Sequence, residues 1–164
     1  QHSKVRDMLP KIIRYWGAIG GVCDGTGIGE PLAYHLKELF DRNNDGLVEA
    51  YKFKAAGDES KSKLGYLAYD FNHNDLIKVP KAPEDPDQLE LWKELRWQVE
   101  HLTREAKRQQ TINFYVPANA EPRKPGHVPH DDLVMALFLL MRAARNIDPN
   151  TGKATAFDRE KSGV

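Results

Sequence analysis

The residues best suited to chemistry gather in one segment late in the chain. His127, His130, Asp131 and Asp132 directly precede a run of nine apolar residues, 133–141. Nine residues are far too few to span a membrane, and a helix that is apolar on all sides is a buried one. We therefore expect Asp131 to begin a helix that enters the core. One aspartate there is an ordinary cap; a second one, with two histidines behind it, favours a functional site. A cap beside a solvated neighbour would explain the pair about equally well.

A second candidate, Asp24, ends a short uncharged run at 18–23 that has the composition of a buried strand. Three glycines in the next five residues predict a flexible turn, and Pro31 suits the first turn of a helix. An acid at the carboxyl end of a buried strand lies where open α/β sheets place their sites. The alternative is a turn aspartate that bonds its own backbone.

The length and composition of the chain limit the kinds of protein that it can be. A chain of 164 residues is long enough for one domain with a real core, and 24 basic residues balance 24 acidic ones, so the total charge does not indicate a polyanion partner. The single cysteine, Cys23, excludes an internal disulfide and a thiolate metal cluster. With no recognisable signal peptide or membrane span, we expect a soluble, intracellular protein. Because Gln1 falls inside a helical pattern, we also expect a fragment of a longer polypeptide.

The elements that must position these residues alternate along the chain. Asp85, Pro86 and Gln88 match the N-cap, N1 and N3 positions of a long helix. This order predicts a three-layer α/β domain over residues 1–147, followed by a flexible tail at 148–164. The apolar spacing predicts helices at 3–16, 30–40, 63–71, 85–106 and 131–145, and strands at 18–23, 47–53 and 112–116.

Two segments resemble the nuclease domain of the large terminase subunit of tailed bacteriophages. They are Asp-Gly-Thr-Gly-Ile-Gly-Glu-Pro at 24–31 and His-Asp-Asp-Leu-Val-Met-Ala-Leu at 130–137. The order of elements between them also agrees, so the resemblance covers roughly residues 1–145. It implies an α/β, ribonuclease H-like three-layer fold with a central mixed sheet flanked by helices. The family's first strands, which carry its first catalytic acid, would precede Gln1 and are missing from this chain.

The resemblance assigns roles to the acidic candidates. Phosphodiester hydrolysis by two divalent ions needs carboxylates from separate elements that converge on one site, and hard oxygen ligands select Mg²⁺ or Mn²⁺. Asp24 and Asp132 are expected to be two such ligands, and Asp131 either a third or a residue that supports them. His127 and His130 would orient a phosphate or shuttle a proton, or else be simple loop residues.

The expected function is that of a metal-dependent endonuclease, which cuts concatemeric double-stranded DNA during genome packaging in the host cytoplasm. The partners implied are double-stranded DNA, the phage portal and the small terminase subunit, with no membrane. The alternative is a non-catalytic DNA- or portal-binding module in which the acids are structural.

Overall fold

The structure, a computed structural model, describes residues 2–41, 48–53, 60–78, 81–107, 111–145 and 147. These residues form a mixed α/β fold with five α-helices and four short strands. The chain divides into two compact units, residues 1–53 with 139–164, and residues 54–138. No described helix is both long and apolar enough to cross a membrane. The predicted tail at 148–164 lies outside the described residues, and the single domain over 1–147 stays a prediction.

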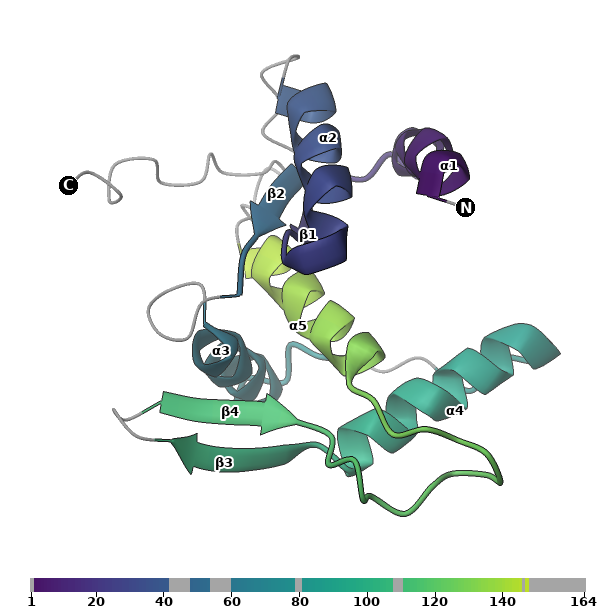
Figure 1. The fold of residues 1–164 in the computed structure, drawn as a ribbon, viewed down its shortest axis with the longest axis vertical. Helices are drawn as coiled ribbons and strands as arrows, with labels where there is room; N and C mark the ends of the chain where they lie inside the picture. Colours follow the sequence, from purple (N-terminus) through teal and green to yellow (C-terminus); the bar gives the residue numbers. More distant parts are fainter. Residues whose placement is uncertain are drawn as a thin grey trace. The chain divides into compact units, whose positions relative to one another are not determined.

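The first unit is built on a pair of parallel strands. β1 (Gly21–Asp24) pairs with β2 (Val48–Tyr51), which confirms that the two predicted strands are neighbours. Two helices, α1 (His2–Tyr15) and α2 (Glu30–Asp41), belong to the same unit, and α2 runs beside the strand pair in Figure 1. Apolar side chains from all four elements form the core: Leu36, Phe40 and Val48, with Leu9, Ile13, Cys23, Leu32 and Leu39 against them.

The apolar run forms α5 (Asp132–Arg145), but this helix is not buried on all sides. Its core face includes Val134 and Phe138, whereas Leu140 is 63 % exposed. The expectation of a fully buried helix was therefore wrong, because an apolar sequence does not ensure that every side finds a partner. In the carboxyl-terminal half, Arg142 donates two hydrogen bonds of 2.9 Å to the Glu49 carboxylate on β2.

The second unit holds two helices and a β-hairpin. They are α3 (Lys61–His73), α4 (Pro86–Glu100) and the antiparallel strands β3 (Thr103–Lys107) and β4 (Thr111–Tyr115), which lie side by side in Figure 1. The helix predicted to continue to residue 106 ends at Glu100, so that prediction was wrong. Glu, Ala and Lys in β3 are good helix formers, but strand pairing with β4 satisfies the backbone of this segment and overrides that local preference.

The described strands thus form two separate two-stranded sheets, one parallel and one antiparallel. The start of α4 agrees with the sequence: the Asp85 carboxylate accepts a hydrogen bond of 2.9 Å from the Gln88 backbone N–H, and Pro86 occupies the first turn. The central mixed sheet implied by the resemblance stays a prediction.

The contact between α3 and β4 depends on a glycine. Gly65 is buried in α3, and a Cβ built there would overlap the ring of Phe114 on β4. That ring also makes an edge contact with Phe138, at a centroid distance of 6.1 Å. One turn earlier, Ser62 Oγ accepts a hydrogen bond of 3.1 Å from the Ile112 N–H. The hairpin therefore packs directly on the helix backbone at Gly65.

Gly65→Ala should destabilise the protein, although alanine is the better helix former by about 1 kcal/mol. The new methyl group forces the Phe114 ring to move within a packed core, which typically costs about 1–3 kcal/mol. Urea unfolding followed by circular dichroism measures the loss. Tyr69→Ala, at a position on the same helix that is 67 % exposed, is the control. A Gly65→Ala protein at least as stable as the parent would contradict this packing.

Candidate functional site

Asp24 lies at the carboxyl end of β1 with an exposed side chain. Its Oδ1 accepts a hydrogen bond of 2.8 Å from the Thr26 N–H, the local backbone bond expected of a turn aspartate. The turn is then tied to the neighbouring strand, because the Gly25 N–H donates to the Tyr51 carbonyl at 2.7 Å. A Cβ at Gly29 would lie 2.8 Å from the Asp24 carbonyl oxygen, so the turn is too tight for a larger residue. These contacts hold the Asp24 carboxylate at the strand end.

Asp131 and Asp132 have different surroundings in the second unit. The Asp131 backbone carbonyl accepts the first helical bond of α5, from Met135, while its carboxylate accepts a bond of 3.1 Å from Lys61 Nζ. The Asp132 side chain is 85 % exposed, and its Oδ2 lies 3.6 Å from His130 Nδ1. Asp132 is therefore the more accessible carboxylate of the two.

The first turn of α5 is capped by Gln98 of α4. The Gln98 Oε1 accepts hydrogen bonds from the N–H groups of Leu133, at 2.9 Å, and Val134, at 3.1 Å. These two backbone donors identify which end of the amide is the oxygen, so the Nε2 group faces the other way. There it lies 3.1 Å from both Glu94 Oε1 and His130 Nδ1. Gln98 is fully buried, and both ends of its amide are hydrogen-bonded.

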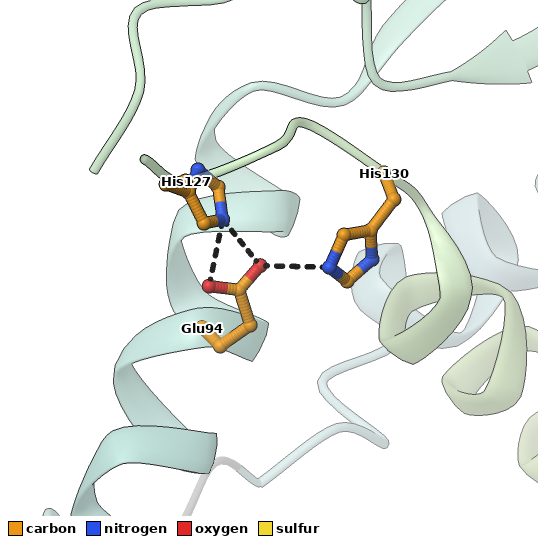
Figure 2. Close-up of side chains that lie close together, drawn as sticks. All are labelled: Glu94, His127 and His130. Atoms are coloured by element: carbon orange, nitrogen blue, oxygen red, sulfur yellow. Dashed lines mark hydrogen bonds and ion pairs between the residues drawn. The ribbon is translucent and has the colours of Figure 1, made fainter. Parts of the chain in front are cut away.

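Glu94 of α4 lies between two histidines of the loop that leads into α5, as Figure 2 shows. His127 Nε2 is 3.0 Å from each Glu94 carboxylate oxygen, and His130 Nε2 is 3.8 Å from Oε1. The ligand-type atoms of the three side chains all lie within 4.8 Å of one another. They belong to one unit and line an open pocket of about 610 Å³. Among the described residues, they form a group of three metal-ligating side chains that lie close enough together to hold one ion.

The electrostatic environment keeps Glu94 ionised. Its side chain is 13 % exposed, and burial by itself would raise the pKa of the carboxyl group. Hydrogen bonds from Gln98, His127 and Arg123 outweigh burial, so the pKa of Glu94 is lowered. Arg123 also donates to Glu90, at 2.9 Å. A negative charge at Glu94 is therefore stable at neutral pH.

Trp97, on the same face of α4, also contacts the loop before α5. The Trp97 Nε1–H donates a hydrogen bond of 3.1 Å to the Glu121 carbonyl, and the Trp97 ring meets the His127 ring edge-on at a centroid distance of 4.5 Å. Glu90, Glu94 and Gln98 follow one another at intervals of four residues, the spacing of one helix face. α4 therefore presents a polar face on which the histidine-bearing loop is ordered.

The structure brings together some of the predicted site residues. His127, His130 and Asp132 lie in one region of the second unit, and Asp131 is paired with Lys61. Asp24 belongs to the other unit, so its proximity to Asp132 stays a prediction. Glu94 and Gln98 were not predicted as site residues, because only capping residues and apolar spacing were used to place the helix at 85–106.

Comparison with known proteins assigns the chain to no family. No family model matches the chain, and neither the curated proteins nor the solved structures contain a match to it.

Gln98→Leu should lower the free energy of unfolding by about 1–3 kcal/mol, because it leaves two N–H groups at the start of α5 without their acceptor. Chemical unfolding of the variant measures the loss. Val99→Ala, at the neighbouring exposed position, should change stability by no more than about 0.5 kcal/mol. Equal stability of the two variants would show that Gln98 does not cap the helix.

Glu90 should titrate far below its ordinary pKa of 4.5. Hydrogen bonds from Arg123 first, then Lys93 and Lys124, lower the pKa of Glu90 to about 2. A carboxyl group with a lowered pKa stabilises the fold above pH 4.5, and this contribution is lost as the pH falls toward 2. Carboxyl-carbon NMR titration should show the pKa rising in Arg123→Gln and staying low in Arg96→Gln, whose guanidinium pairs with Glu100 instead. A pKa near 4.5 in the parent protein would contradict the ion-pair arrangement.

Proposed function

We propose that this chain belongs to a metal-dependent endonuclease of the kind found in the large terminase subunit of tailed bacteriophages. The observation that carries the proposal is the exposure of two carboxylates at positions that the resemblance assigns to metal ligands. Asp24 ends a strand in a parallel pair, and Asp132 begins α5 with its side chain 85 % exposed. The ribonuclease H-like fold is part of the same proposal.

The chemistry of the donor set fits the implied ions. Carboxylate oxygens are hard ligands suited to Mg²⁺ or Mn²⁺. A pair of such ions, when bound, activates the attacking water and stabilises the leaving oxygen of the phosphodiester. Asp24 and Asp132 supply ligand oxygens from two separate elements. Asp131, whose carboxylate is held by Lys61 Nζ at 3.1 Å, keeps the start of α5 and its neighbour Asp132 in place.

The proposed substrate is concatemeric double-stranded DNA, and the proposed location is the host cytoplasm. The phage portal and the small terminase subunit are proposed partners on the resemblance alone. The alternative is a non-catalytic DNA- or portal-binding module. Such a module would have the same fold, but its function would need neither of the two exposed carboxylates.

The full gene product should nick plasmid DNA with Mg²⁺ or Mn²⁺, and EDTA should abolish the cleavage. Asp24→Asn and Asp132→Asn should each slow nicking by at least about 100-fold, because small misplacements of the reacting groups cost about that much. DNA binding, measured by gel shift in EDTA, should change little, since basic groups make the phosphate contacts.

Asp7→Asn, on the exposed surface of α1, is the matched control and should nick at the parental rate. Parental nicking by Asp132→Asn would remove that residue from the mechanism. A gene product that binds DNA but never cuts it with either metal would replace the nuclease proposal with the binding module.

A further inference from the structure

We propose that Glu94, His127 and His130 are the ligands of a zinc site, and that none of the carboxylates assigned to DNA cleavage is a ligand of it, although Asp132 lines the same pocket. The inference rests on the geometry of the second unit and does not depend on the nuclease proposal. All three residues lie on the open pocket between α4 and the loop before α5.

The distance from Glu94 to each histidine is close to that in a tetrahedral zinc site, and the ligand-type atoms of all three side chains lie within 4.8 Å of one another. Ligands bound to zinc at about 2.0–2.2 Å in a tetrahedron lie about 3.3–3.6 Å from one another. His127 Nε2 and His130 Nε2 lie 3.0 Å and 3.8 Å from the Glu94 carboxylate. Shifts of a few tenths of an ångström would bring both separations to the zinc values.

The donor set selects the ion. Two imidazole nitrogens and one carboxylate suit zinc, whereas magnesium and calcium prefer oxygen ligands throughout. Three protein ligands that face an open pocket leave the fourth position of the ion to water or to a further ligand. Gln98 and Arg123 also donate hydrogen bonds to the Glu94 carboxylate and hold it in place.

His127 is held ready as a ligand. Its side chain is only 7 % exposed, and the edge contact with Trp97 fixes the ring with Nε2 toward Glu94. Its Nδ1 is buried and has no hydrogen-bond partner among the described residues. When Nε2 binds an ion, the ring proton lies on Nδ1. At His127 this proton meets no competing donor at Nδ1, and the bond from Nε2 to the ion replaces the hydrogen bond from Nε2 to Glu94.

His130 lies between Gln98 and Asp132. The Gln98 Nε2 group donates toward His130 Nδ1 at 3.1 Å, which leaves the proton of a neutral ring on Nε2. Zinc binding at Nε2 moves the proton to Nδ1, where Gln98 offers no acceptor. An acceptor for this proton is Asp132 Oδ2, which lies 3.6 Å from Nδ1.

The experiment is calorimetric titration of the full chain with ZnCl₂ in excess Mg²⁺, which occupies oxygen-ligand sites. We expect one zinc per chain, with affinity at least about 10-fold weaker in Glu94→Gln and His130→Gln. Visible absorption of bound Co²⁺ reports the ligand geometry independently.

His73→Gln, at an exposed position in the last turn of α3, is the matched control and should bind zinc like the parent. Circular dichroism shows whether Glu94→Gln folds; His130→Gln, at a side chain that is 44 % exposed, carries the test if it does not. Absence of saturable zinc binding, or parental affinity in His130→Gln, overturns the site. Loss of zinc binding in Asp24→Asn with parental affinity in His130→Gln would place the ion on the acids instead.

Discussion

The arrangement of the second unit depends on one buried amide, that of Gln98. A helix begins with N–H groups that have no partner within the helix, and a buried amide must itself be satisfied at both ends. Gln98 meets both requirements at once, because its oxygen caps α5 while its nitrogen bonds Glu94 and His130. The cap therefore comes from a residue distant in the sequence, and it couples the start of α5 to the histidine-bearing loop.

This coupling explains why the two aspartates differ. Since Gln98 caps the helix, neither aspartate side chain has to do so. The Asp131 carboxylate turns to Lys61, and the Asp132 carboxylate projects into solvent beside His130. The exposure of Asp132 is thus a consequence of the fold around it, and an accessible carboxylate is what the proposed metal chemistry requires.

The sequence predicted those features that depend on local or nearby residues. The cap at Asp85, the helix after the glycine turn and the existence of β1 and β2 follow from capping, turn chemistry and apolar spacing. The end of α4 at Glu100 could not be predicted in this way, because most residues of 103–107 are good helix formers and this segment becomes a strand only by pairing with β4.

The site residues divide in the same way: residues close together in the sequence were predicted, and a residue brought to them by a distant contact was not. His127 and His130 stood out because they cluster in the sequence, whereas Glu94 joins them only when α4 meets the loop, 33 residues away from His127. A polar stripe at intervals of four residues along α4 was the available signal, since a buried helix face that carries Glu94 and Gln98 must find polar partners.

The central proposal, which rests on the resemblance, is that Asp24 and Asp132 are both ligands of a two-metal site. Electron paramagnetic resonance of the full gene product loaded with Mn²⁺ tests it most directly, because ions about 3.5–4 Å apart interact magnetically. The account predicts the spectrum of a coupled Mn²⁺ pair, lost in Asp24→Asn and in Asp132→Asn alike. Isolated Mn²⁺ ions only, or a coupled pair that survives both substitutions, would contradict it.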